Sequence, residues 1–477
     1  MTEYANFIGG EWVDAEGGET FETYNPAAPD EAVATYPESG VSETDAAVAA
    51  AVDAGEAWGD TPGPERGRVL SRASALLADR KEDITDHLVR EEGKTRPEAG
   101  GEVQRAIDIF DYYGAKARDL GGVVKGSSGR NTTLRTKNEP VGVAGLITPW
   151  NYPVAIPAWK IAPALAAGNA AVIKPATLAP GCTHEIAEAL AEAGLPEGVL
   201  NVVTGPGSEV GDRLASHPDV DAVSFTGSTA VGNAVRDAAA EDGKRVQLEM
   251  GGKNPTVVSD TADVAEAAEI VAAGAFGVTG QACTACSRAI VYEDAYDDFV
   301  EAVVDAAEAI EPAPGLGDSD MGPQVSESEL DATLDYVDVG RTEATIETGG
   351  NALAHEGHFV EPTVFSDVAP DARIAQEEIF GPVLSVIPVS GYEEALDVAN
   401  GVDYGLSASI VTEDHSEANR FVDDIEAGVV KINEKTTGVE LHVPFGGMKA
   451  SSSETYREQG DAGLDFYTIS KTVYDNY

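Results

Sequence analysis

Cysteine and basic residues are both scarce in this chain. Only three cysteines occur among 477 residues. Three cysteines provide no disulfide framework, which agrees with a reducing cytoplasmic compartment. Lysine and arginine together number 31 against 83 aspartates and glutamates, for a formal net charge of −52. Because so acidic a protein would repel nucleic acid and anionic membranes, we expect neither as a partner.

Long apolar runs are absent as well. No stretch of the sequence reaches the roughly 18 apolar residues of a membrane span. The start, MTEYANFIGGEWV, lacks the basic region and apolar run of an export signal. Hydrophobic residues make up 43% of the chain, which fits a folded globular protein, and 477 residues suggest two or three domains. We therefore expect a soluble protein of the cytoplasm.

The acidic residues are dispersed rather than gathered in a tail. Residues 293–311, EDAYDDFVEAVVDAAEAIE, place them on a helical pattern, which favours folded structure over disorder. Mutual repulsion of so many carboxylates is tolerable where salt shortens the Debye length, to about 3 Å at 1 M. The composition therefore predicts a protein from a salt-rich cytoplasm.

Strands and helices alternate between residues 141 and 250. Strands are expected at 141–147, 169–174, 199–203, 221–225 and 245–250. Near-continuous apolar strands in such an alternation indicate an α/β fold whose parallel sheet is covered on both faces. Ligands of such sheets bind beyond the carboxyl ends of the strands. We therefore expect a nucleotide beside the loops that follow the strands, at 148–151, 174–177, 204–207 and 226–229.

A second alternation extends from about residue 254 to 433 and predicts a second α/β domain that contains Cys283. Helical patterns occur at 44–59 and 69–93. Residues 132–140 and 465–474 have the composition of strands outside either domain. Because exposed edge strands need pairing partners, these segments favour a homodimer or homotetramer.

The segment GQACTACSR, residues 280–288, places Cys283 and Cys286 with two residues between them. Such a pair is typical of a redox dithiol, of half a zinc site, or of one catalytic thiolate with a second cysteine nearby. A structural zinc site usually requires four Cys or His ligands at set spacings, and no H-x3-5-H segment is present. A redox dithiol is typical of a small domain with the motif near its start. The spacing therefore favours a single nucleophile and no metal, and such a nucleophile requires a base and an oxyanion site.

Two polar residues suit these roles. Glu249 ends a predicted strand among apolar and glycine residues, where burial raises a carboxyl pKa towards that of a general base. A solvated or capping acid is the alternative for Glu249. Asn151, in TPWNYP, either makes its own turn or donates a side-chain N–H to an oxyanion.

Five segments of the chain resemble those of a known family. They are PWNYP (149–153), LEMGGKNP (248–255), GQACTACSR (280–288), EEIFGPV (377–383) and PFGGMK (444–449). In this order, and over essentially the whole chain, they resemble the aldehyde dehydrogenase superfamily. The resemblance implies a Rossmann-like nucleotide-binding domain, a second, catalytic α/β domain and a small β oligomerisation element. The implied boundaries are 1–118 with 141–250, then 251–450, and 119–140 with 463–477.

The resemblance assigns nucleophilic attack on an aldehyde to Cys283. The Asn151 side chain and the Cys283 backbone N–H would hold the oxyanion of the thiohemiacetal, and hydride would pass to a nicotinamide. Glu249 would then activate the water that hydrolyses the thioester. Lys160 and Glu458 match a proton relay near Glu249, with a surface lysine and a helix-start glutamate as the alternatives.

The same resemblance identifies candidate residues for the cofactor. The usual G-x-G-x-x-G fingerprint is absent after the first strand of the sheet, which agrees with the family's different mode of nucleotide binding. The matched positions are Thr148, Trp150, Lys174, Gly207, Ser228 and Glu378. NAD-selective relatives often have a glutamate at the position of Thr177, where it would repel the 2′-phosphate of NADP. Since Thr177 can donate a hydrogen bond beside Lys174, we expect NADP to be favoured over NAD.

Residues 436–474 are similar to the aldehyde dehydrogenases that oxidise 2,5-dioxopentanoate to 2-oxoglutarate in pentose and sugar-acid degradation. Trp159 stands where succinate semialdehyde dehydrogenases often have an arginine, which counts against that substrate. Arg105 is the candidate cation for the substrate carboxylate, with a solvated helix face as the alternative. A broad-specificity or betaine-type enzyme and a catalytically silent scaffold are the alternative functions. Cys286 is interpreted either as a small buried thiol or as a resolving thiol that protects Cys283 from overoxidation.

Overall fold

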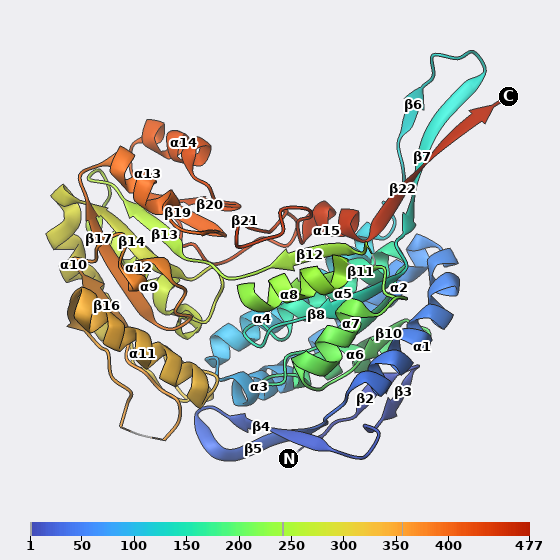
Figure 1. The fold of residues 1–477 in the computed structure, drawn as a ribbon, viewed down its shortest axis with the longest axis horizontal. Coiled ribbons are helices and arrows are strands. Elements are labelled where there is room, and N and C mark those ends of the chain that lie inside the picture. The colour runs from blue at the N-terminus through green and yellow to red at the C-terminus, as the bar shows by residue number, and fades with distance from the viewer. Residues whose placement is uncertain (1, 241–242, 355) are drawn as a thin grey trace.

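Two seven-stranded sheets, each covered by helices, form the body of the protein (Figure 1). The computed structural model describes residues 2–240, 243–354 and 356–477. The strand order of the first sheet is β12-β11-β8-β9-β10-β2-β3. Its strands are β2 (Asn6–Ile8), β3 (Glu11–Val13), β8 (Val143–Ile147), β9 (Ala170–Lys174), β10 (Leu200–Val202), β11 (Ala222–Thr226) and β12 (Arg245–Glu249).

The strands from β8 to β12 are all parallel, and β2 and β3 extend the sheet in the antiparallel sense. All five strands predicted between residues 141 and 250 are confirmed. Every residue of β8, β9 and β11 is buried, which explains their continuous apolar sequences. Because these strands are parallel, the loops that follow them lie along one edge of the sheet, as expected.

Helices cover both faces of this first sheet, as predicted. Helices α2 to α6 contribute to the hydrophobic core on one face, and helices α1, α7 and α8 to the core on the other. The region predicted to be helical at 69–93 divides into two helices at Arg80, whose backbone leaves the helical conformation. The elements are α1 (Val41–Asp60), α2 (Gly63–Asp79), α3 (Lys81–Glu92), α4 (Arg96–Lys116), α5 (Ala155–Ala167), α6 (Gly181–Glu192), a π-helical turn η1 (Gly207–Gly211), α7 (Asp212–Ser216) and α8 (Thr229–Ala240).

The second sheet has the order β15-β16-β17-β14-β13-β19-β20 and is parallel except for β15. Its strands are β13 (Asn254–Val258), β14 (Cys286–Tyr292), β15 (Thr345–Thr348), β16 (Thr363–Ser366), β17 (Val383–Val389), β19 (Ser407–Val411) and β20 (Val429–Ile432). The helices beside it are α9 (Val264–Phe276), α10 (Glu293–Glu308), α11 (Glu327–Glu343), α12 (Arg373–Gln376), α13 (Tyr392–Asn400) and α14 (His415–Asp424). The second α/β alternation is thereby confirmed.

Smaller strands lie outside these two sheets. The N-terminal strands form a three-stranded sheet in the order β1-β5-β4, which the sequence patterns did not indicate because many of its residues are exposed and polar. Two short strands, β18 and β21, pair with each other. The strands are β1 (Thr2–Glu3), β4 (Thr20–Asn25), β5 (Ala28–Pro37), β18 (Tyr404–Gly405) and β21 (Met448–Lys449).

An antiparallel arm projects from the body and contains the C-terminus (Figure 1). It consists of β6 (Val124–Gly126), β7 (Thr132–Pro140) and β22 (Thr468–Asn476). The strand expected at 465–474 begins three residues later, because its first residues end helix α15 (Gly460–Phe466). Among the residues described in the structure, no helix is both long and apolar enough to cross a membrane.

Candidate active site

Two cavities meet at Cys283. The larger cavity has a volume of about 400 Å³, and the smaller cleft has a volume of about 220 Å³. Cys283 lines both cavities. It lies in the loop between a short 3-10 turn, η2 (Gly277–Gly280), and strand β14. The thiol therefore lies where a ligand in one space can meet a ligand in the other.

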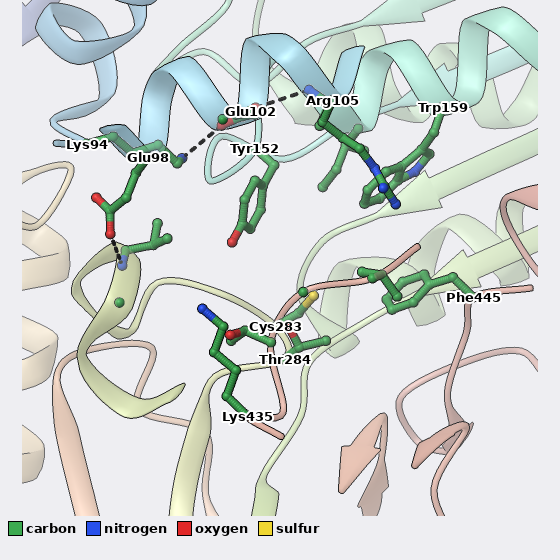
Figure 2. Close-up of a pocket in the computed structure, with 18 of the residues that line it drawn as sticks. Lys94, Glu98, Glu102, Arg105, Tyr152, Trp159, Cys283, Thr284, Lys435 and Phe445 are labelled. Atoms are coloured by element: carbon green, nitrogen blue, oxygen red, sulfur yellow. Dashed lines mark hydrogen bonds and ion pairs between the residues drawn. The ribbon is translucent and has the colours of Figure 1, made fainter. Parts of the chain in front are cut away.

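The loop before Cys283 has a strained backbone. Val278 and Thr279 both have positive φ angles, 52° and 56°, which are unfavourable for β-branched residues. Glu98 of α4 accepts a hydrogen bond from the Val278 N–H at 2.7 Å (Figure 2). Asn254, in the GGKNP segment, donates from Nδ2 to the Cys283 carbonyl at 2.8 Å. These two contacts hold the loop that contains Cys283.

The surroundings of Cys283 disfavour its thiolate. Burial raises the pKa of the thiol to about 12, and the nearby carboxylates Glu378, Glu249 and Glu458 add to the rise. A thiol of such high pKa is protonated near neutral pH, so nucleophilic attack requires a base that takes its proton.

Asn151 and Asn254 are two side-chain amides that donate to backbone carbonyls of the loop around Cys283. Asn151 is 3% exposed, lines the smaller cleft and donates from Nδ2 to the Gln281 carbonyl at 2.8 Å. An amide NH2 group has two hydrogens, so one remains for an oxyanion. The backbone carbonyl of Asn151 accepts a hydrogen bond from Lys94 Nζ. Lys94 Nζ also lies 3.2 Å from Glu102 Oε2, with which it forms an ion pair. No local sequence signal pointed to Lys94, because its role depends on a contact with a residue 57 positions away.

Glu249 is buried at the end of β12, 2% exposed. Its carboxylate accepts hydrogen bonds from the Gly447 N–H at 3.2 Å and from Ser452 Oγ at 3.1 Å. Burial, and next the negative charge of Glu458, raise the Glu249 pKa well above its usual value. A side chain at Gly446 would place its Cβ 2.5 Å from Glu249 Oε1, so only glycine fits there. The interpretation of Glu249 as a solvated acid is wrong.

Lys160 and Glu458 are charged neighbours of Glu249. They form an ion pair, and their side chains are 1% and 3% exposed. Lys160 Nζ also donates to Ser224 Oγ at 2.7 Å. The alternatives of a surface lysine and a helix-start glutamate are therefore wrong, since α15 begins two residues after Glu458.

The smaller cleft contains part of the predicted cofactor set. Trp150, Ser228 and Glu378 line it. Glu378 accepts a hydrogen bond from the Gly252 N–H at 2.8 Å, and burial raises its pKa to about 7. Thr226 also lines the cleft, and its buried hydroxyl has no hydrogen-bond partner among the described residues. A polar ligand with hydroxyl and phosphate groups fits such a lining.

The other predicted cofactor residues lie along the same sheet edge, outside the lining of the cleft. Thr148 directly follows β8, is buried, and leaves its hydroxyl without a partner in the described structure. Lys174 ends β9, and burial lowers its pKa to about 8. Thr177 is half-buried three residues further on. Gly207 begins η1, where an added Cβ would meet no atom within 4 Å, so a ligand can approach its backbone.

Arg105 extends from α4 towards the larger cavity (Figure 2). Its Nη2 donates to Gln459 Oε1 at 3.0 Å, and burial lowers its pKa. The alternative of a solvated helix face is therefore wrong. Trp159 lines the same cavity, with its ring centroid 5.9 Å from that of Phe445. Phe445 belongs to the PFGG segment, in which no sequence signal distinguished this ring as part of a cavity wall.

Cys286 lines neither cavity. Its Sγ donates to Thr256 Oγ1 at 3.2 Å, and burial raises its pKa to about 11. A Cβ added at Gly274 of α9 would lie 3.2 Å from the Cys286 Cβ, so the thiol packs between β14 and this helix. This placement supports the interpretation of a small buried thiol.

Comparisons with known proteins agree with this geometry. A model of the aldehyde dehydrogenase family matches residues 12–473. Alpha-ketoglutarate semialdehyde dehydrogenase of Haloferax volcanii is 66% identical over 477 residues, covering 99% of this chain and 99% of that protein. 2,5-Dioxopentanoate dehydrogenase of Saccharolobus solfataricus is 42% identical over 472 residues, covering 98% of each. The crystal structure of an NAD-dependent aldehyde dehydrogenase from Sinorhizobium meliloti superposes with a TM-score of 0.97 at 36% identity, covering 100% of this chain and 95% of that one.

Proposed function

The chain belongs to the aldehyde dehydrogenase family and is an NAD(P)-dependent enzyme, and from this premise we propose that it oxidises 2,5-dioxopentanoate to 2-oxoglutarate. The observation on which the proposal depends is Arg105, a cation in the same cavity as the nucleophile Cys283. An aldehyde with a carboxylate at its far end needs such a cation. The printed names of the Haloferax and Saccharolobus relatives support the same substrate. Trp159 occupies the cavity wall where a second arginine would favour succinate semialdehyde.

The residues around Cys283 support the following roles. Glu249 accepts the thiol proton, and Cys283 Sγ forms a bond to the aldehyde carbon. The free N–H of Asn151 and the backbone N–H of Cys283 donate to the resulting oxyanion. The hydride acceptor is supplied by NAD(P) when it is bound, for which the smaller cleft and the edge loops are the proposed site.

Hydrolysis of the thioester on Cys283 needs an activated water. Glu249 takes a proton from that water, and the buried Lys160–Glu458 pair stands next to it as the start of a proton path to solvent. Overall, the aldehyde and one water become the carboxylate, with release of protons and transfer of one hydride.

NADP is the proposed preferred cofactor. Thr177 lacks the negative charge that would repel a 2′-phosphate, and Lys174 provides a cation three residues earlier. NAD remains usable in this proposal, because it differs from NADP only in lacking the 2′-phosphate.

We also propose the cellular setting and assembly. The net charge of −52 suits a salt-rich cytoplasm, and the projecting arm suits a homodimer or homotetramer. In this proposal residues 1–118 and 141–250 bind the nucleotide, 251–450 supply the nucleophile, and 119–140 with 463–477 assemble the oligomer.

The test is a comparison of substrates in about 2 M KCl, where charge repulsion is screened. Reduction of NADP and of NAD is followed with 2,5-dioxopentanoate, succinate semialdehyde, betaine aldehyde and simple alkanals. We expect kcat/KM for 2,5-dioxopentanoate to exceed the others at least tenfold, about 1.4 kcal/mol of transition-state preference. A flat or alkanal-led profile would indicate a broad-specificity enzyme instead.

A further inference from the structure

The loop before the nucleophile passes through three consecutive residues with a left-handed backbone. Val278, Thr279 and Gly280 have φ angles of 52°, 56° and 68°. Gly280 adopts this conformation without strain, and an added Cβ there would lie 2.1 Å from the Gly381 carbonyl oxygen. Val278 and Thr279 are β-branched and adopt it at a cost in free energy. Because strained backbone persists only where the surrounding structure holds it, the contacts of this segment bear on the position of Cys283, three residues later.

Two contacts from different parts of the chain hold the strained residues. Thr279 Oγ1 donates to the Gly322 carbonyl at 3.0 Å, in the segment between α10 and α11. The Val278 N–H donates to Glu98 Oε1 at 2.7 Å, although the two residues are 180 positions apart (Figure 2). Helix α4, which carries Glu98, belongs to the core of the first sheet, and α9, which ends two residues before Val278, to a core of the second. This bond therefore joins the helices of the two sheets beside the active site.

The Glu98 carboxylate is itself fixed at the start of α4. Its Oε2 accepts hydrogen bonds from the Thr95 N–H at 3.0 Å and from Thr95 Oγ1 at 2.8 Å. Thr95 is the N-cap of α4, so these contacts form a capping box. One carboxylate oxygen is thus bound to the helix start and the other to Val278. The side chain is held in the orientation in which it meets the strained loop.

The same end of α4 also contacts the segment that contains the other oxyanion donor. Glu102, one helical turn after Glu98, accepts hydrogen bonds from two backbone N–H groups at the start of α5, at 2.8 and 3.1 Å. Asn151 lies just before that helix start. Two carboxylates on adjacent turns of one helix therefore fix the two segments that supply Asn151 and Cys283.

The charge of Glu98 does not account for its place beside this loop. After burial, the charges that raise the pKa of the Cys283 thiol are those of Glu378, Glu249 and Glu458. Glu98 is not among them. Its contact with Val278 is the observation that connects it to the nucleophile.

We propose that Glu98 is a positioning residue for the nucleophile. By accepting from the Val278 N–H, it keeps the strained loop in place. The thiol and backbone N–H of Cys283 thereby stay aligned with the Asn151 amide. Since every aldehyde reacts at Cys283, this role is independent of which aldehyde is the natural substrate. Glu98 also lines the larger cavity, so a direct contact with the substrate is the alternative that a test must separate.

The experiment measures the first-turnover rate of cofactor reduction by rapid mixing, at saturating cofactor and one KCl concentration, with pentanal and with 2,5-dioxopentanoate. In Glu98→Ala the rate is expected to fall about 10- to 100-fold, by the same factor for both aldehydes, because small displacements of reacting atoms have effects of this size. Glu98→Gln should be intermediate, since its amide oxygen is a neutral acceptor. Thr95→Ala is the matched control, because it breaks the same capping box without a contact to Val278. It should lower the melting temperature and leave the rate within about twofold of the parent.

A second variant tests the strain directly. In Val278→Gly the left-handed backbone has no side-chain penalty, so the further loss caused by Glu98→Ala should shrink to about threefold or less. An equal loss in both backgrounds, a loss confined to one aldehyde, or the same loss in Thr95→Ala would overturn the positioning role. A parent that does not prefer 2,5-dioxopentanoate would contradict the proposed substrate and leave this comparison intact, because pentanal serves equally well.

Discussion

Lys160 and Glu458 form an ion pair in the interior of the protein, where their side chains are 1% and 3% exposed. The two residues are 298 positions apart in the chain. Glu458 is also the main neighbouring charge that raises the pKa of Glu249. The pair therefore links the stability of this buried region to the proton affinity of Glu249.

Removal of one partner of this pair should destabilise the protein more than removal of both charges. Lys160→Met leaves Glu458 buried without a countercharge, and we expect a loss of about 3 to 5 kcal/mol in the free energy of unfolding. Lys160→Met with Glu458→Gln should recover a substantial part of that loss. Urea unfolding at fixed high salt measures both, and equal losses in the single and double variants would contradict a coupled pair.

Glu249→Gln should slow both halves of the reaction. Without the carboxylate, hydrolysis of the thioester slows, and we expect kcat to fall about 10² to 10⁴-fold. Rapid mixing should also show a slower burst of NADPH than in the parent, because the same carboxylate takes the proton of the Cys283 thiol. A burst as fast as that of the parent would show that Glu249 acts only in hydrolysis and that another base deprotonates Cys283.

In the parent, the hydrolytic step should depend on pH through Glu249. The base must be ionised, and its pKa is raised, so the rate should rise with pH through a value above the usual 4.5 and then level off. A rate already constant from pH 5 upwards would be inconsistent with the buried base.

Glu378→Gln should make Cys283 more reactive in the absence of cofactor. Glu378 is the largest charge effect that raises the Cys283 pKa, after burial, and the thiolate is the form that alkylates. The pH profile of iodoacetamide labelling should therefore shift to lower pH in this variant and stay unchanged in Glu378→Asp. Cys182 and Cys286 are buried, and Cys283→Ser provides the background rate. Superimposable profiles would refute this electrostatic assignment.

Thr177→Glu should reverse the proposed cofactor preference. A carboxylate at this position repels the 2′-phosphate, and we expect kcat/KM for NADP to fall about tenfold or more, with a much smaller effect on NAD. In the parent, use of NADP should weaken as pH rises through about 8, where Lys174 loses its charge. Thr177→Ser is the control, and equal effects on both cofactors would argue against this placement of the 2′-phosphate.

Stability should increase strongly with salt. At low ionic strength the net charge of −52 opposes the compact state, and screening in molar KCl reduces that repulsion. We expect the melting temperature and activity to rise together between 0.1 and 2 M KCl, ranges over which the Debye length falls from about 10 Å to below 3 Å. An unchanged melting temperature in low salt without added osmolyte would refute this prediction.

The sequence predicted the parts of the fold that have local patterns. The buried strands β8, β9 and β11 are continuous runs of small and branched apolar residues, which permit few other interpretations. The exposed strand β4, TFETYN, has no such run, and its place in a sheet depends on β5. Local pattern therefore predicts buried strands well and exposed ones poorly.

The residues of the candidate site also differ in how well the sequence predicts them. Cys283, Glu249 and Asn151 lie in the motifs GQACTACSR, LEMGGKNP and PWNYP. Lys94 and Lys435 are single lysines outside any such motif. Their places become evident only where the turn between α3 and α4 and the segment after β20 meet at one cavity. Arg105 can be predicted from the sequence only because an anionic substrate requires a cation.

The arm has a consequence for the order in which the protein is made. β7 pairs with β22 from Pro140 opposite Thr468 to Thr132 opposite Asn476. Thr132 precedes Asn476 by 344 residues, so β7 leaves the ribosome long before its neighbour is synthesised. Until then one side of β7 is an open edge that invites pairing with other chains. The three-stranded arm is thus completed only when β22 has been synthesised, and until then β7 has β6 as its one strand neighbour.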